Sequence, residues 1–141
     1  MGKVVNSYSS KDSGISAVTI QNRYGRFTGI AACHPDDIDN FSNFAGERYA
    51  EIRATAEFAK FRYRQEKIKL KAIKNLLNDI NYLSFEQSKG TDKIMRKIKL
   101  KIRDYSQSAE DWKNLYHYLN EQIAIQDKNR EKILLRAKKN N

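Results

Sequence analysis

The chain has 141 residues, of which 27 are Lys or Arg and 17 are Asp or Glu, so its formal net charge is +10. This length has room for one domain and excludes a second enzyme core. Hydrophobic residues make up 40% of the chain, enough for a folded core, which excludes disorder throughout. The positive charge attracts anions at long range, so we expect nucleic acid, nucleotides, acidic proteins or anionic lipid headgroups as partners.

Three segments with strand character occupy the first forty residues, and turn residues separate them. They are Val4–Tyr8, Ile15–Gln21 and Phe27–Ala32. Gly14 and Gly25 lie in the two connections, where tight hairpins need a positive φ. The sequence therefore predicts an antiparallel ribbon of two or three strands. Such a ribbon is marginal alone in water, so it must lie against the helices or pair with another subunit.

The segment after the third strand is His34-Pro35-Asp36-Asp37, which holds the only proline. It resembles the strand-end motif of zinc deacetylases of the sugar N-acetyl type, which implies His34 and Asp37 as zinc ligands and Asp36 as a base. Zinc catalysis needs about three protein ligands, and His117 is the only other histidine. We therefore interpret the motif as a strand exit and helix start, and expect no metal and no enzymatic activity.

A long helix is predicted from about residue 42 to residue 84, because apolar residues recur there at steps of three and four. At 1.5 Å per residue it would be about 60 Å long. A second apolar stripe flanks the first and contains Ala54, Phe58, Phe61, Ile68, Ala72 and Leu76. The helix then has more apolar surface than this chain can cover, so we expect at least a homodimer.

The rest of the chain is also predicted to be helical, after a turn near residues 85–91. Lys97–Arg103 alternates apolar and basic residues, a pattern that fits a strand as well, although we favour a helix. Ser108 with Asp111 predicts the start of a last helix. The expected fold is α+β and mainly helical: a β-ribbon over residues 1–40, then two or three long antiparallel helices over residues 41–141, in a single domain.

Arginines and tyrosines concentrate between residues 48 and 64, where guanidinium groups suit phosphate and aromatic rings suit bases. A second basic cluster runs from Arg96 to Arg103. The alternative for most of the lysines is a solvated helix face balanced by nearby glutamates. The expected ligand-binding residues are Arg26, Arg48, Tyr49, Arg53, Arg62, Tyr63, Arg96 and Arg103. No cofactor is expected.

The stretch from Arg26 to Asp37 resembles a short pattern in small phage and prophage proteins. The order of elements is similar to that of the Thoeris anti-defence sponge family. That resemblance implies a non-enzymatic, phage-encoded protein that sequesters a cyclic nucleotide between subunits in the cytoplasm of a bacterial host. No ligand motif of the family can be matched residue by residue here.

Two other functions remain open. The first is an inhibitor, similar to anti-CRISPR proteins, that binds nucleic acid or a bacterial defence nuclease through its basic helices. The second is a structural phage protein that uses its helices only for assembly. The single cysteine, Cys33, excludes an intramolecular disulfide and fits a reducing cytoplasm. No apolar run is long enough to span a membrane.

Overall fold

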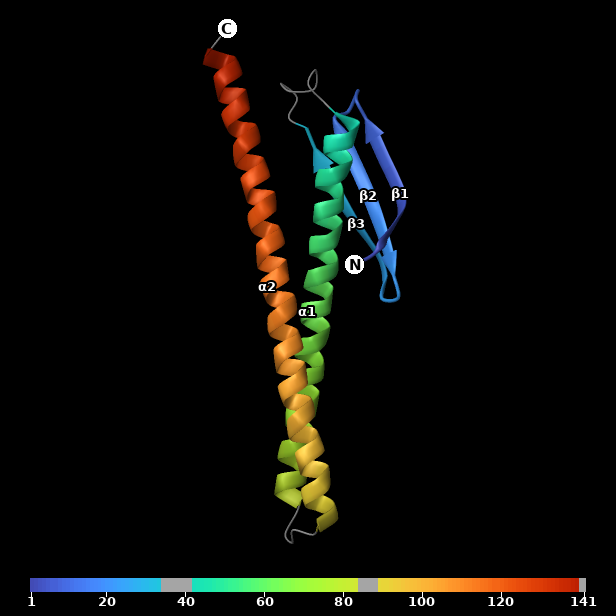
Figure 1. The fold of residues 1–141 in the computed structure, drawn as a ribbon, viewed down its shortest axis with the longest axis vertical. Coiled ribbons are helices and arrows are strands. Elements are labelled where there is room, and N and C mark those ends of the chain that lie inside the picture. Colours follow the sequence, from blue (N-terminus) through green and yellow to red (C-terminus); the bar gives the residue numbers. More distant parts are fainter. Residues whose placement is uncertain (34–41, 84–88, 140–141) are drawn as a thin grey trace. The chain divides into compact units, whose positions relative to one another are not determined.

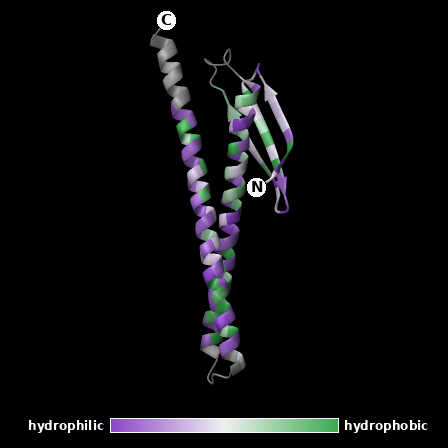
Figure 2. Ribbon diagram, in the orientation of Figure 1, coloured by the Kyte–Doolittle hydropathy of each residue, from purple (hydrophilic) through white to green (hydrophobic). Residues whose placement is uncertain are grey.

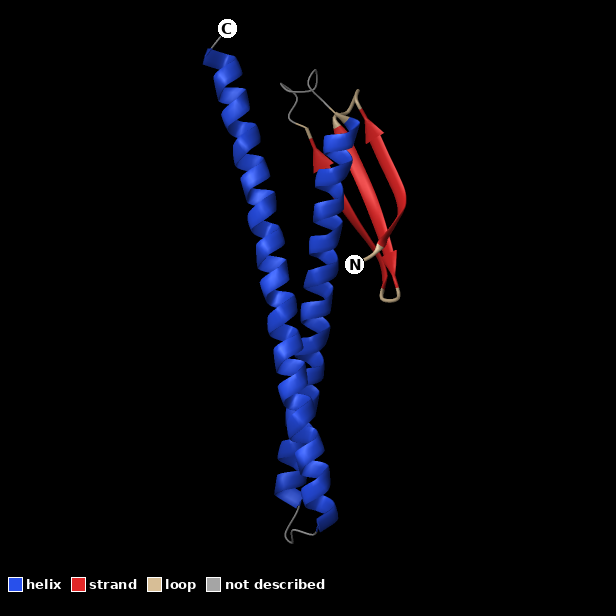
Figure 3. Ribbon diagram, viewed as in Figure 1, coloured by secondary structure: helices blue, strands red, loops and turns tan. Residues whose placement is uncertain are grey.

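The computed structural model describes residues 1–33, 42–83 and 89–139. Three strands come first: β1 (Lys3–Ser10), β2 (Ile15–Asn22) and β3 (Gly25–Ala32). Two helices follow: α1 (Asn43–Leu83) and α2 (Lys89–Lys139) (Figure 1, Figure 3). The predicted α+β, mainly helical fold is confirmed, with two long helices in the described part of the chain.

The three strands form one antiparallel sheet in the order β1-β2-β3. Gly14 has a φ of 67° and Gly25 a φ of 129°, as predicted for the two connections. The amide of Gly14 donates to the carbonyl oxygen of Ser10 at 2.8 Å and closes the first turn. In the second turn, Asn22 Oδ1 accepts from the amide of Tyr24 at 2.8 Å. The strands were predictable because their alternation and their turn residues are both local signals.

Helix α1 begins at Asn43 and is capped by Ser42. The hydroxyl of Ser42 accepts from the amide of Ala45 at 3.3 Å, and its carbonyl oxygen accepts from the amide of Gly46 at 2.9 Å. The bond to the hydroxyl satisfies an amide that has no partner within the helix, and the bond to the carbonyl oxygen is the first of the helical ladder. The predicted helix start at Pro35 lies outside the described residues, and the first turn of α1 holds no acidic residue.

Helix α2 is continuous through two segments on which the sequence was ambiguous or misleading. Lys97–Arg103 is helical, as favoured. The expected helix start at Ser108 is wrong, because α2 passes through this residue without a break. Asp111 accepts a hydrogen bond from Gln107 Nε2 at 2.9 Å, one helical turn earlier, so its carboxylate supports the middle of a helix.

The chain divides into two compact units, and both helices contribute to each. The sheet unit comprises Met1–Ala59 and Leu115–Asn141, and the hairpin unit comprises Lys60–Asn114. No helix in the described part of the chain combines the length and the apolar character that crossing a lipid bilayer would need.

In the sheet unit, α1 packs against one face of the sheet at very short range. Ala50 and Ala54 of α1 are fully buried, as are Ser16 and Ile20 of β2 within a few per cent. A methyl group added to Gly29 of β3 would overlap the carbonyl oxygen of Ala50 and the amide nitrogen of Ala54. The absent side chain of Gly29 therefore lets the helix backbone rest directly on the strand.

In the hairpin unit, residues of α1 and α2 meet across an antiparallel pair. The guanidinium of Arg62 lies 5.4 Å from the ring centre of Trp112, and Lys69 Nζ lies 5.8 Å from that of Tyr105. Ile98 and Ala109 of α2 are buried on the same side of their helix. Arg62 and Glu66 of α1 are buried too, so this core is partly ionic.

Candidate anion-binding surfaces

Positive charge is concentrated in the hairpin unit. Residues 60–114 contain fifteen Lys and Arg against seven Asp and Glu, so this unit carries eight of the ten net positive charges. The sheet unit, with more residues, carries the other two. Purple, hydrophilic residues accordingly run along much of both helices in Figure 2. The partner that this charge attracts should therefore contact the hairpin unit first.

On α1, four cations of the hairpin unit form a row. Arg64, Lys67, Lys71 and Lys74 are all exposed. Their steps of three, four and three residues place them on one side of a helix. The apolar residues of this segment that are partly buried, such as Leu70 and Ile73, lie off this row. The row therefore covers solvent-facing helix surface and not the hairpin core.

On α2, six exposed cations lie within eleven residues, around the buried side chain of Ile98. They are Lys93, Arg96, Lys97, Lys99, Lys101 and Arg103. In the part of the chain that the structure describes, none of these six is paired with a carboxylate. The two predicted site residues Arg96 and Arg103 thus belong to an exposed basic face.

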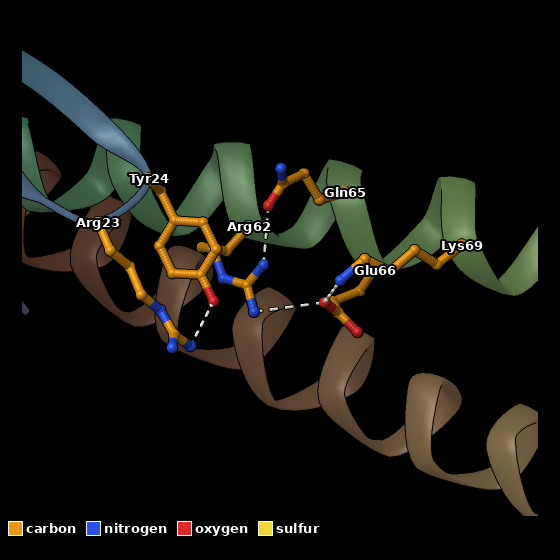
Figure 4. Close-up of polar contacts among 6 residues, drawn as sticks. All are labelled: Arg23, Tyr24, Arg62, Gln65, Glu66 and Lys69. Carbon is orange, nitrogen blue, oxygen red and sulfur yellow. Dashed lines mark hydrogen bonds and ion pairs between the residues drawn. The ribbon is translucent and has the colours of Figure 1, made fainter.

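Arg62, another predicted site residue, has internal partners (Figure 4). Its guanidinium lies 3.3 Å from Glu66 Oε1 and donates to Gln65 Oε1 at 2.8 Å. Lys69 Nζ lies 3.3 Å from the same oxygen of Glu66. The structure therefore gives Arg62 a place in the hairpin core, where it links α1 to Trp112 of α2.

The aromatic side chains of the hairpin unit offer little surface for base stacking. Tyr63, a predicted stacking residue, is half-buried, and Lys67 Nζ lies 5.3 Å from its ring centre. Tyr105 is half-buried beneath Lys69. Every aromatic side chain that the structure describes between residues 60 and 114 is at least partly buried. The basic faces therefore present charge without exposed rings.

Two predicted site residues of the sheet unit come together in a groove of about 570 Å³ between β3, α1 and α2. Arg26 of β3 and Arg53 of α1 line it, with Tyr116 and Asn120 of α2. Glu57 also lines the groove, and Arg53 donates to Asp127 Oδ1 at 3.1 Å. Two arginines, a tyrosine and an asparagine thus line the groove, but part of its positive charge is neutralised within the fold.

Arg48 lies in a second groove, of about 410 Å³, between α1 and the β1–β2 side of the sheet. Glu47 and Glu51 line the same groove, so two carboxylates face one guanidinium. The hydroxyl of Ser9 donates to Glu47 Oε1 at 3.3 Å. Tyr49 is exposed on α1 and does not line the groove. This arrangement suits an anion less well than the first groove does.

The residues that suggested a zinc site, His34, Asp36 and Asp37, lie outside the described residues. Cys33, which precedes them, is half-buried. His117 is exposed, and its ring centre lies 5.8 Å from that of Tyr116. No group of three His, Cys, Asp or Glu that could hold a metal ion occurs within residues 1–33, 42–83 and 89–139.

Comparisons of the chain with protein families, with curated proteins and with solved structures found no match.

Proposed function

We propose that the protein binds nucleic acid, without catalysis, through the phosphate-facing cations of its hairpin unit. The observation that carries this proposal is the excess of eight positive charges on residues 60–114, displayed on exposed faces of both helices. Lys and Arg that neutralise phosphates release condensed counterions, which supplies most of the free energy of sequence-independent binding. Among the functions that the sequence leaves open, nucleic-acid binding is the one that uses the positive charge of residues 60–114.

The spread of the cations favours a polymer over a single nucleotide. From Arg64 to Lys74, and from Lys93 to Arg103, each basic face extends over about 15 Å at 1.5 Å per residue. One DNA strand presents a phosphate about every 3.4 Å, so about four phosphates fit along such a face. Because the aromatic rings that the structure describes in this unit are at least partly buried, we expect contacts to the nucleic-acid backbone and little preference for base sequence.

The test is fluorescence anisotropy with labelled duplexes of about 30 base pairs and unrelated sequences, between 50 and 300 mM NaCl. With four to six phosphate contacts, the slope of log K against log salt should lie near −4 to −5. The variant Lys97→Gln/Lys101→Gln/Arg103→Gln should reduce the slope by about 2.7, which is 0.9 for each lost contact. All duplex sequences should bind with similar affinity.

The matched control is Lys3→Gln/Lys11→Gln/Lys128→Gln, which removes three exposed cations from the sheet unit and lowers the net charge equally. This control should keep the slope of the unmodified protein within one unit. An equal reduction of the slope in both triple variants would show that net charge alone matters. Absence of binding at 50 mM NaCl would contradict the proposal.

A second candidate function is retention of a small phosphate-bearing ligand, such as a cyclic nucleotide, in the groove lined by Arg26 and Arg53. It is supported by the presence of Arg26, Arg53, Tyr116 and Asn120 around one space of nucleotide size. In a bacterial host, such retention would sequester a nucleotide immune signal. Under the first candidate function, the protein would instead cover nucleic acid or block the nucleic-acid site of a defence nuclease.

Titration calorimetry with a panel of mononucleotides and cyclic dinucleotides tests the second candidate. We expect heat with at least one of them and loss of that heat in Arg26→Gln. Arg23→Gln is the control, because Arg23 is exposed on the neighbouring turn and donates to the hydroxyl of Tyr24 at 2.7 Å (Figure 4). Heat that survives in Arg26→Gln, or no heat with any nucleotide, would remove this candidate.

A further inference from the structure

The face of the sheet that points away from α1 is almost free of charge. The alternation of buried and exposed residues along the strands, with the register of the two pairings, defines this outer face. Its twelve positions are Lys3, Asn6, Tyr8, Ser10, Ile15, Ala17, Thr19, Gln21, Arg26, Thr28, Ile30 and Ala32. Lys3 and Arg26 flank Gln21 at one end of this face, and the other rows of paired residues carry no charged side chain. Arg26, Thr28 and Ile30 belong to the edge strand β3 and also line the groove described above.

Large apolar side chains on this outer face are open to solvent. Tyr8 and Ile30 are each 60% exposed, and Ile15 is 38% exposed. Tyr8 pairs with Ala17, and Ala17 pairs with Ile30, so one uncharged row crosses all three strands. In the adjacent row, the hydroxyls of Thr19 and Thr28 are hydrogen-bonded to each other at 2.8 Å. These side chains form a flat and weakly polar surface, of the kind that sheets cover when they stack.

We propose that this outer face binds the same face of a second copy of the chain, so that the protein forms a two-fold symmetric dimer through its sheets. Electrostatics select this occupant. The hairpin units, each with a net charge of +8, repel one another, whereas the sheet faces can meet through rows without charge, away from the end that holds Lys3 and Arg26. A two-fold interface also joins identical patches, which suits a surface with no charge to match.

The exposed apolar side chains of α1 in the hairpin unit are less suited to a second copy. Ile68 and Leu76 of α1 are 70% and 47% exposed. They lie among the basic residues Arg64, Lys67, Lys69, Lys71 and Lys74 of the same helix. Self-association there would bring two rows of cations together in an interface, at a cost of several kcal/mol for like charges. We therefore expect the dimer interface on the sheet and not on helix α1.

The area of the outer face determines how tightly the dimer should associate. Three strands of eight residues, at about 3.3 Å per residue and spaced by about 4.8 Å, give a flat area of roughly 380 Å² per copy. Side-chain relief raises the accessible area, so the dimer should bury about 1,000 Å² in total, at the lower end for specific interfaces. We therefore expect a reversible dimer with a Kd in the micromolar range.

Dimerisation would add to nucleic-acid binding, although the inference does not depend on it. Two hairpin units in one assembly convert the second contact with a long duplex into an intramolecular step. Affinity for a duplex that is long enough for both units should then exceed that for a short duplex. The dimer itself is expected in the absence of any nucleic acid.

The test is sedimentation velocity of the full, nuclease-treated chain from 1 to 500 µM in 0.5 M NaCl, which screens the hairpin charges. The unmodified protein should move from monomer to dimer across this range. Tyr8→Lys/Ile30→Lys should raise the Kd at least 100-fold, because four new charges would face one another. Tyr8→Ser/Ile30→Thr should raise it about tenfold without adding charge. The helix variant Ile68→Lys/Leu76→Lys should leave it unchanged.

Circular dichroism melting separates loss of the dimer from loss of the fold, since all of these side chains are largely exposed and their variants should melt within a few degrees of one another. A chain that stays monomeric at 500 µM would overturn the proposal. So would a dimer that persists in both sheet variants, or one that is lost only in the helix variant.

Discussion

Replacing Gly29 with alanine tests the close packing of α1 on the sheet. The added methyl group would meet main-chain atoms of Ala50 and Ala54, and the main-chain carbon of Arg53 would lie 2.9 Å from it. Main-chain atoms in a helix cannot rotate away, so the strand and the helix must separate by roughly 1 Å. That separation loosens contacts made by Ala50 and Ala54, which are fully buried. We expect a loss of about 3 kcal/mol, the upper end for an overpacked site.

Urea unfolding followed by circular dichroism at 222 nm measures this loss, and thermal melting should show a decrease in Tm of about 10 °C for a chain of this size. Ile30→Ala is the control, because Ile30 is in the same strand, on the other face, and 60% exposed. It should cost less than about 1 kcal/mol. A loss below 1 kcal/mol in Gly29→Ala would refute the close approach. Recovery of stability on adding Ala54→Gly would show that side chains, and not the backbone, are in conflict.

Three further changes test the remaining contacts by urea unfolding. Glu66→Ala should destabilise the protein by about 3 kcal/mol because it leaves buried Arg62 without its carboxylate, whereas Arg62→Met/Glu66→Leu should stay within about 1 kcal/mol of the unmodified protein. Asp127→Ala should cost less than about 1 kcal/mol, since its side chain is 54% exposed. Ser42→Ala should cost about 1 kcal/mol through loss of the helix cap, and a loss near zero would contradict that role.

The strands and the extent of α1 were predictable because their signals are local. The alternation of Ile15–Gln21 and the glycines of the two turns fix the ribbon within a few residues. Ser108 misled the prediction because Ser followed by Asp three residues later is also compatible with the interior of a helix. The hydrogen bond from Gln107 to Asp111 distinguishes a helix interior from a helix start. The spacing of residues in the sequence does not reveal such a side-chain hydrogen bond.

The candidate sites were predictable only in part, because a charge can be counted from the sequence but its surroundings cannot. Arg62 and Arg64 look alike in the sequence, yet Arg62 is buried beside Glu66 and Arg64 is exposed. The i, i+4 spacing of Arg62 and Glu66 was an available signal of an internal pair. Tyr116 and Asn120 were missed, since they reach the groove of Arg26 from a helix that follows about ninety residues later.

The discontinuity of the sheet unit has a consequence for the order of folding. Residues 1–59 leave the ribosome well before residues 115–141, with which they share one unit. Closing an unstructured loop of the 55 intervening residues would cost about 3.5 kcal/mol in chain entropy. A formed antiparallel helix pair avoids most of this cost, because it already brings Arg62 beside Trp112. Residues 60–114 should therefore fold before Leu119 packs into the sheet unit. A chain whose synthesis stops before residue 115 would lack part of the core of that unit.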